Sequence, residues 1–244
     1  RVAEHRAACG CGNALRGGRA VRAMKVVPDP LGRRLLSLYH GAPPAVRAHV
    51  GVRWATCPFR AVVAELPGSG AILEVGCGHG LLSLYLALSS PARRVTGIDV
   101  DGDKLEAARA AAARGGLAAA FEAAKGADLP DGPWDGIAIV DVLYLLGADD
   151  QRSLLGSCAG ALAPGGVLAV KEMAPEPRWK ARWNVVQETA AVKLLGITEG
   201  EELTFLPPLE LATAMTSEGL EVRERPVHKG YPHPHHLLVG RRPR

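Results

Sequence analysis

The sequence predicts an α/β fold in which a largely parallel sheet is flanked by helices. Short apolar runs alternate with helical patterns along most of the chain, which is typical of βαβ units. In the stretch at residues 71–88, an apolar run is followed by three alternate glycines and then by a helical pattern. This order predicts a buried strand, a tight turn and the start of a helix.

The predicted turn contains Gly76, Gly78 and Gly80, and the strand before it carries the acidic residue Glu74. Glycine adopts positive φ at little steric cost and lets a ligand approach the bare backbone. The free N–H groups and the dipole at the start of the following helix favour a carboxylate or a phosphate. The turn is therefore predicted to hold the polar part of a ligand.

A second predicted strand, at residues 94–99, ends in Asp99. A carboxylate placed about twenty residues after such a turn can accept hydrogen bonds from both hydroxyls of a ribose. The carboxyl ends of parallel strands meet at one edge of a sheet, where ligands bind in open α/β folds. The sequence therefore predicts a nucleoside-containing cofactor at this edge.

The pattern from Glu74 to Gly80 is Glu-x-Gly-x-Gly-x-Gly, and it resembles motif I of the class I S-adenosylmethionine-dependent methyltransferases. Residues 134–143 look like the fourth strand of that family, and residues 162–168 look like its turn into strand five. The resemblance covers residue 68 to the end of the sequence, and it is closest to uncharacterised bacterial small-molecule methyltransferases. It implies a Rossmann-like sheet of seven strands, mostly parallel with the last strand antiparallel, and S-adenosyl-L-methionine as the cofactor.

The resemblance also implies which residues hold this cofactor. In the family the glycine loop lies under the methionine part, the acid of motif I lies near the methionine amino group, and the acid after strand two binds the ribose. Lys125 stands where the family usually has an acid that meets adenine, so Asp128, or backbone and apolar contacts, is expected there instead. The predicted cofactor-binding residues are Glu74, Gly76, Cys77, Gly78, Gly80, Asp99, Val100, Asp128 and Asp141.

The candidate catalytic residues follow strands four and six. Asp141 and Tyr144 come just after strand four, although a turn cap and simple packing are the alternative roles. The connection at residues 228–236 contains four histidines, and His233 or His235 is the candidate general base because imidazole titrates near neutrality. The alternative is a surface loop. Prolines in this connection prevent a helical ligand spacing, so no metal site is predicted.

The elements before strand four follow from local signals. Helices are expected on both sides of Pro43-Pro44 and at residues 59–66. Asp103 is a suitable N-cap for a helix at 103–114, which Gly115-Gly116 would end. Residues 118–124 form a weaker strand pattern.

The elements after it follow in the same way. A helix is expected at 149–162, and Pro164-Gly165-Gly166 should turn the chain into strand five at 167–173. Lys171 and Glu172 lie near the active-site end of this strand, where a surface or paired role for Glu172 is favoured over contact with substrate. A helix at 207–218 and strands at 220–227 and 237–240 complete the sheet.

The predicted organisation has three parts. Residues 1–27 are expected to be a disordered basic extension, and we hypothesise that the native protein begins at Met24. Residues 28–66 form a helical cap, and residues 67–244 form the S-adenosylmethionine-binding domain. Within it, residues 174–206 are a lid-like insertion, whose helical face would cover the acceptor, rest on a membrane surface or pack against the cap. That face comprises Trp179, Trp183, Val186, Ala190 and Leu194.

Charge and cysteine content narrow the class of protein. Residues 1–60 hold 11 basic and two acidic residues, whereas the rest of the chain is weakly acidic, which argues against a specific nucleic-acid partner. The basic part, or residues 178–195, would account for a peripheral membrane contact. The five cysteines show neither zinc spacing nor a disulfide pattern, so Cys77 and Cys158 are expected to be buried thiols in a cytoplasmic protein.

Three alternatives to a small-molecule methyltransferase remain. A nicotinamide-dependent oxidoreductase would need a third glycine at Leu81, and a non-catalytic nucleoside-binding module would not need the intact glycine pattern. A protein or RNA methyltransferase would favour Asn/Asp-Pro-Pro-Tyr in place of Asp141-Val142-Leu143-Tyr144. The sequence favours a small hydrophobic, aromatic or lipid-like acceptor methylated by in-line displacement, and it predicts neither the acceptor atom nor the oligomeric state.

Overall fold

The computed structural model describes residues 29–125, 127–173, 203–231 and 234–244. In this part of the chain, seven strands form one sheet in the order β3-β2-β1-β4-β5-β7-β6. Strands β3, β2, β1, β4 and β5 are parallel, whereas β7 runs antiparallel to both β5 and β6. The predicted sheet, mostly parallel with an antiparallel last strand, is confirmed.

The central strands are buried on both faces, which explains their continuous apolar runs. In β1, Ile72 belongs to one core, whereas its neighbours Leu73 and Val75 belong to the other. The strands are β1 (Gly70–Val75), β2 (Arg93–Asp99), β3 (Ala119–Ala123), β4 (Trp134–Val140), β5 (Leu162–Met173), β6 (Glu221–Pro226) and β7 (His235–Arg241).

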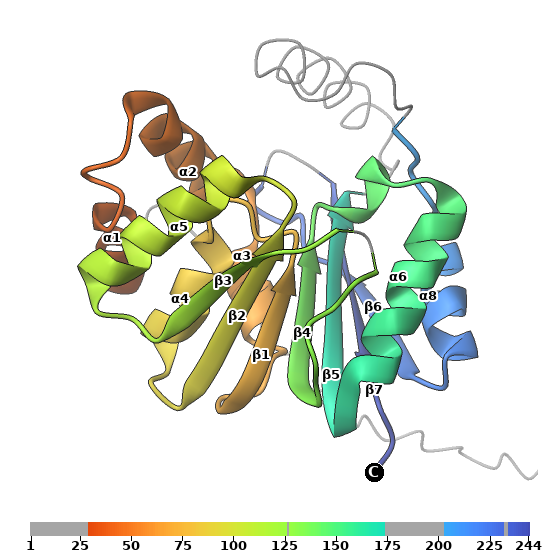
Figure 1. The fold of residues 1–244 in the computed structure, drawn as a ribbon. Helices are drawn as coiled ribbons and strands as arrows, with labels where there is room; N and C mark the ends of the chain where they lie inside the picture. The colour runs from red at the N-terminus through yellow and green to blue at the C-terminus, as the bar shows by residue number, and fades with distance from the viewer. Residues whose placement is uncertain (1–28, 126, 174–202, 232–233) are drawn as a thin grey trace, which may run out of the picture.

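Helices cover both faces of the sheet (Figure 1). One core joins the sheet to α1 (Pro30–Ser37), α2 (Pro44–Thr56), α3 (Phe59–Val63), α4 (Leu81–Ser89) and α5 (Gly102–Gly115). The other core joins it to α6 (Ala148–Ala161) and α8 (Pro208–Ser217).

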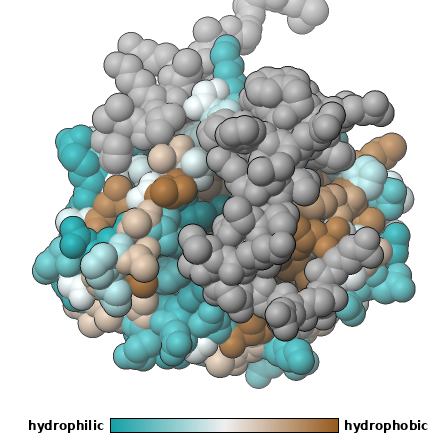
Figure 2. Space-filling model, turned by 90° about the horizontal axis from the view of Figure 1, so that it is seen from above, coloured by the Kyte–Doolittle hydropathy of each residue, from teal (hydrophilic) through white to brown (hydrophobic). Residues whose placement is uncertain are grey.

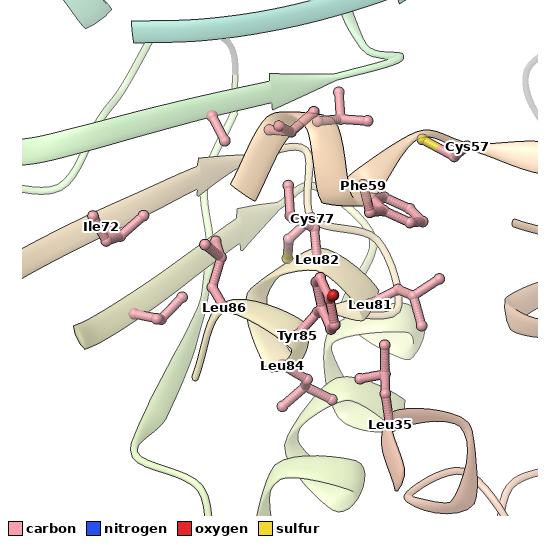
Figure 3. Packing of buried hydrophobic residues seen from close by; sticks show 14 of the residues in the cluster. Leu35, Cys57, Phe59, Ile72, Cys77, Leu81, Leu82, Leu84, Tyr85 and Leu86 are labelled. Carbon is pink, nitrogen blue, oxygen red and sulfur yellow. The ribbon is translucent and has the colours of Figure 1, made fainter. Parts of the chain in front are cut away.

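Helix α4 is apolar on all sides because it lies between the sheet and the cap. Figure 3 shows Leu82 and Leu86 turned toward Ile72 of β1, with Leu35 of α1 on the other side of the helix. All four side chains are fully buried. Burial of each contributes about 1.5–3 kcal/mol relative to exposure, so α4 fixes the position of the turn that precedes it.

The cap helices are anchored to that turn. Tyr39 is 1% exposed, and its hydroxyl donates a hydrogen bond of 2.7 Å to the backbone carbonyl of His79. Asp29 is the N-cap of α1, because its carboxylate accepts a hydrogen bond of 2.7 Å from the Gly32 N–H, and it also pairs with Arg60 of α3. Tyr39 therefore joins the cap to the glycine turn, whereas Asp29 joins two helices of the cap to each other.

Several predicted boundaries differ from the structure. The helix expected at 59–66 ends at Val63. Strand β5 begins at Leu162, because Trp134 pairs with Leu162 before a shift of register at Gly136. Most of the expected insertion, with its helical face, lies outside the described residues, as do the expected basic extension and His233.

The described cysteines are Cys57, Cys77 and Cys158, and all three are buried thiols. Burial was expected for Cys77 and Cys158. Within the described ranges, no helix is both long and apolar enough to span a bilayer.

The N-cap of α5 is Asp101, so the prediction of Asp103 is wrong. The Asp101 carboxylate accepts a hydrogen bond of 3.1 Å from the Lys104 N–H, whereas Asp103 lies inside the first turn. The Asp99 carboxylate accepts a hydrogen bond of 3.0 Å from the Asp101 N–H, which moves the helix start two residues earlier.

We predict that Asp101→Ala lowers the free energy of unfolding by about 1 kcal/mol, because the helix loses its N-cap. Asp103→Ala is the matched control, and it should cost no more than about 0.5 kcal/mol. Urea unfolding measures both values, and equal losses would contradict the assigned cap.

Candidate functional site

The predicted site lies at the carboxyl ends of the strands, at the top of Figure 1. Hydrophilic and hydrophobic residues lie close together on this face (Figure 2). The turn after β1 crosses it, and Gly76, Gly78 and Gly80 all have positive φ, between 52° and 74°. The N–H groups of Gly76 and Cys77 both donate to the Ile98 carbonyl, at 2.8 and 2.9 Å. The turn is therefore fastened to β2 by backbone hydrogen bonds.

The Asp99 carboxylate continues this attachment. It accepts a hydrogen bond of 2.7 Å from the Gly78 N–H and one of 3.0 Å from the Asp101 N–H. A carboxylate has about four lone-pair positions, so both oxygens can still accept hydroxyl donors. Asp99 therefore lies beside the glycine turn, partly exposed, with capacity for a ribose.

The three glycines have different surroundings. A Cβ at Gly76 would lie 2.3 Å from Val142 Cγ2, and one at Gly80 would lie 2.7 Å from the Phe121 ring. At Gly78 the nearest atom, Lys104 Cδ, would be 3.9 Å away. Gly76 and Gly80 are thus required for packing, whereas Gly78 exposes its backbone to open space where a ligand can approach.

Two predicted cofactor residues are directed inward. Glu74 is 4% exposed, and its Oε2 accepts hydrogen bonds from both the N–H and the hydroxyl of Ser83, at 2.7 and 2.5 Å. Burial raises the pKa of Glu74 to about 8. The Cys77 thiol packs against β2, where a Cβ at Gly97 would lie 2.9 Å from Cys77 Sγ. Both side chains thus support the turn from below.

Two further predicted cofactor-binding residues at this end of the sheet, Val100 and Asp128, are accessible to a ligand. Val100, directly after Asp99, is 70% exposed, so its side chain is open to a ligand at this edge. Asp128 is exposed in the loop after β3, beside the half-buried Leu129, which packs against the core under the sheet. Their contact with adenine stays a prediction.

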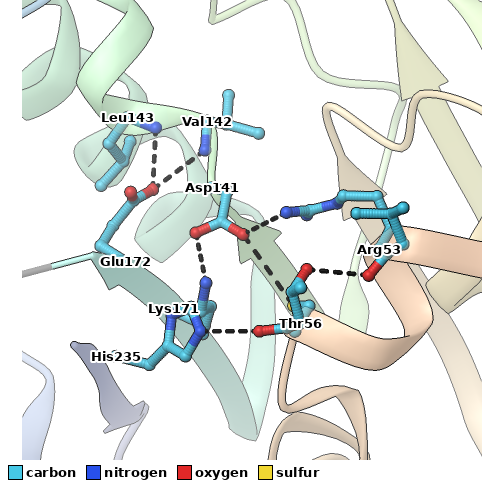
Figure 4. A network of polar contacts seen from close by, with 10 residues as sticks. Arg53, Thr56, Asp141, Val142, Leu143, Lys171, Glu172 and His235 are labelled. Atoms are coloured by element: carbon cyan, nitrogen blue, oxygen red, sulfur yellow. Dashed lines mark hydrogen bonds and ion pairs between the residues drawn. The ribbon is translucent and has the colours of Figure 1, made fainter. Parts of the chain in front are cut away.

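A buried ionic network lies at the end of β4 (Figure 4). Asp141 is 8% exposed and has a φ of 57°, a conformation that is uncommon for a residue other than glycine. It pairs with the fully buried Lys171 of β5 and, at 2.8 Å, with Arg53 of α2. Although burial alone would raise the pKa of Asp141, Lys171 and Arg53 hold it well below its usual range.

Glu172 supports the same loop from the other face of the sheet. Its Oε1 accepts hydrogen bonds from the Val142 and Leu143 N–H groups, at 3.0 and 2.9 Å, at the start of the short 3₁₀ helix η1 (Leu143–Leu145). Glu172 is 5% exposed, and burial and the nearby Asp141 raise its pKa to about 8. Glu172 is therefore bonded within the protein, which agrees with the role favoured over substrate contact, and its carboxylate supports the loop.

The structure changes the interpretation of the predicted histidines. His235 belongs to β7, where it pairs with Met173 of β5, and it is 2% exposed. Its Nε2 is 2.9 Å from the Thr56 carbonyl at the end of α2, so Nε2 is the protonated donor. The prediction of an accessible loop base is wrong for His235. Pairing with β5 makes β7 begin at His235, so this residue is buried in the sheet and not in the loop.

Tyr144 lies on η1 and stacks on Phe205, with ring centroids 5.1 Å apart and an interplanar angle of 9°. The Tyr144 carbonyl also accepts a hydrogen bond of 2.9 Å from the Thr204 N–H. This aromatic pair stands beside the end of β4. A catalytic role for Tyr144 stays a prediction.

Two residues that sequence reasoning missed face the same region. Arg53 is one of many basic residues in a basic segment, and its partner is 88 positions away. His49, one helical turn earlier, contacts the His79 ring of the glycine turn, with centroids 4.9 Å apart. Their spacing of four residues places both side chains on one face of α2. This spacing is the one feature of the sequence that could have linked them.

A family model described as "Methyltransferase domain" matches residues 72–166, which include the glycine turn, Asp99 and Asp141. An uncharacterized methyltransferase of Mycobacterium tuberculosis is 35% identical over 103 residues, covering 42% of this chain and 50% of the relative. A ubiquinone biosynthesis O-methyltransferase of Xylella fastidiosa is 32% identical over 166 residues, covering 66% and 65%.

The chain thus spans about half the length of the first of these curated relatives and 65% of the second. Among solved structures, an O-methyltransferase family protein of Burkholderia thailandensis has a TM-score of 0.65 at 23% identity. That match covers 85% of this chain and 62% of the other. At this identity the likeness establishes the fold alone.

We predict that alanine at Gly76 and alanine at Gly78 lower the free energy of unfolding by unequal amounts. Gly78→Ala should lower the free energy of unfolding by about 1–2 kcal/mol, from its left-handed conformation alone. Gly76→Ala should cost about 1–3 kcal/mol more, because its Cβ overlaps Val142. Urea unfolding compares them, and a Gly78→Ala loss as large as that of Gly76→Ala would refute the open surroundings of Gly78.

Stability is also predicted to fall as pH rises. The folded-state pKa of Glu172 is about 8, above its ordinary value of 4.5, so folding favours the protonated carboxyl. Its contribution is fully present below pH 4.5 and is lost as pH rises through 8. Urea unfolding at pH 5, 7 and 9 should show this decline, and Glu172→Gln should make it shallower. An unchanged slope in the variant would contradict the assignment.

Proposed function

The chain belongs to the class I S-adenosylmethionine-dependent methyltransferases, and we propose that it transfers the methyl group of S-adenosyl-L-methionine to a small acceptor. The observation that best supports this proposal is the hydrogen bond from the Gly78 N–H to the Asp99 carboxylate. This bond holds the carboxylate that we propose for ribose binding next to the partly exposed backbone of Gly78.

The proposed cofactor site follows from the surroundings of these two residues. The ribose hydroxyls would bind Asp99, and the adenine ring would rest against the exposed Val100, with Asp128 at its edge. The methionine part would pass over Gly78, the one glycine of the turn whose Cβ position is open. Glu74 and Cys77 would act from below, by holding the turn in place.

When bound, S-adenosyl-L-methionine supplies an electrophilic methyl group on a sulfonium. The residues of the chain have to hold donor and acceptor in line and to exclude water, and good positioning can lower a barrier by about 7–11 kcal/mol. Asp99 and the glycine turn would position the donor. The end of β4, with Asp141, would face the methyl group and the acceptor.

The proposed acceptor is small and partly hydrophobic or aromatic. The stacked rings of Tyr144 and Phe205 offer an apolar surface beside the end of β4, and an aromatic or lipid-like group can pack against them. No charged groove for nucleic acid is needed for this function, and residues 178–195, which we expected to cover the acceptor or to meet a membrane, lie outside the described ranges.

Calorimetric titration with S-adenosyl-L-homocysteine tests the proposal. Wild-type protein should bind it, and Asp99→Asn should weaken binding at least about tenfold, which corresponds to about 1.4 kcal/mol. Asp135→Asn is the matched control, because the Asp135 carboxylate also accepts a backbone hydrogen bond, 2.8 Å from the Ala71 N–H, but at the opposite edge of the sheet. Equal affinities for Asp99→Asn and wild type would contradict the assignment.

A further inference from the structure

At the end of β4, two positively charged side chains face one negatively charged side chain. Arg53 and Lys171 share the single carboxylate of Asp141, one cation on each oxygen. The other carboxyls nearby, Glu74 and Glu172, accept hydrogen bonds from backbone N–H groups elsewhere. Burial raises the pKa of both to about 8, so neither supplies a full negative charge at neutral pH. The centre therefore carries an excess of positive charge.

Arg53 is the member of this network that a ligand can reach. Its side chain is 32% exposed, whereas those of Lys171 and Asp141 are 0% and 3% exposed. A guanidinium has five N–H donors, and Nη1 bonds to Asp141 while the group lies over the Phe59 ring. In the described part of the chain the other donors of Arg53 have no hydrogen-bond partner. A guanidinium in this state is suited to a carboxylate.

The same region offers little to remove a proton from an acceptor. Asp141 is bound by two cations, and His235 is 2% exposed, with its Nε2 bonded to the Thr56 carbonyl, so an acceptor cannot reach it. Desolvation, the His79 ring and the cations Arg53 and Lys104 lower the pKa of His49 to about 4, which makes it a weak base. Among the described residues, the site is therefore suited to an acceptor that arrives already ionised.

We propose that the acceptor is a carboxylate, that Arg53 binds it, and that methylation of its oxygen gives a methyl ester. This inference rests on the proposed function. A lone pair of the carboxylate oxygen forms the new O–CH₃ bond while the C–S bond pair returns to sulfur, so the anion and the sulfonium become a neutral ester and a neutral thioether. No proton is transferred. An ammonium acceptor would instead add a charge of the same sign beside two cations and the sulfonium.

Binding of a matched pair of probes to the protein saturated with S-adenosyl-L-homocysteine tests the inference. Phenylacetate and phenylacetamide have nearly the same shape and differ in charge. Wild-type protein should bind phenylacetate at least tenfold more tightly than phenylacetamide. Arg53→Met should reduce this preference to less than twofold, and Arg53→Lys, which keeps the charge, should restore part of it.

Arg47→Met is the control variant, because Arg47 is an exposed arginine of the same helix that lines an outer pocket with Leu36 and Pro44. It should keep the full preference. Thermal unfolding and the affinity for S-adenosyl-L-homocysteine show whether each variant is folded with its cofactor site intact.

The outcomes separate this inference from the proposed function. If wild-type protein does not bind S-adenosyl-L-homocysteine, the proposed function fails. If it does, but phenylacetate binds no better than phenylacetamide or neither binds, the carboxylate inference alone is overturned. It is also overturned if Arg53→Met weakens S-adenosyl-L-homocysteine tenfold and leaves the preference for phenylacetate, since Arg53 would then serve the carboxylate of the donor.

Discussion

The carboxylate of Asp141 joins three parts of the chain that are far apart in sequence. Helix α2 contributes Arg53, strand β5 contributes Lys171, and Asp141 itself ends β4 in a left-handed conformation. Breaking a buried pair of this kind by removing one partner typically costs about 3–5 kcal/mol, because a charge is left without compensation. The cap and the sheet edge are thereby held in one arrangement. Glu172 then fixes the loop that carries Tyr144.

The glycine turn depends on a different kind of contact. Its N–H groups are bound to the carbonyl of Ile98 and the carboxylate of Asp99, so β2 determines the path of the turn after β1. Helix α4 and Tyr39 hold the turn from the opposite side. Of the three glycines in the turn, Gly78 alone has open space at its Cβ position. A small exposed region is thus kept rigid by a large buried one, which is what pre-organised binding of a polar ligand requires.

The sequence predicted those features that depend on local patterns. The strands, the turn with its three glycines and the acid at the end of β2 are predictable, because each leaves a signal within a few residues. The Arg53–Asp141 pair left no such signal, since one basic residue among many has no distinguishing neighbour. Lys171 was noted near the site, and its position in an apolar strand is itself unusual for a lysine. His235 was misplaced because pairing between β5 and β7 decides where β7 begins.

A crystal structure of the complex with S-adenosyl-L-homocysteine tests this account most directly. We expect the ribose hydroxyls on Asp99, the homocysteine chain over Gly78, and the sulfur atom facing Arg53, Asp141 and Tyr144. A nucleoside bound elsewhere on the molecule, or a sulfur atom turned away from the end of β4, would contradict it.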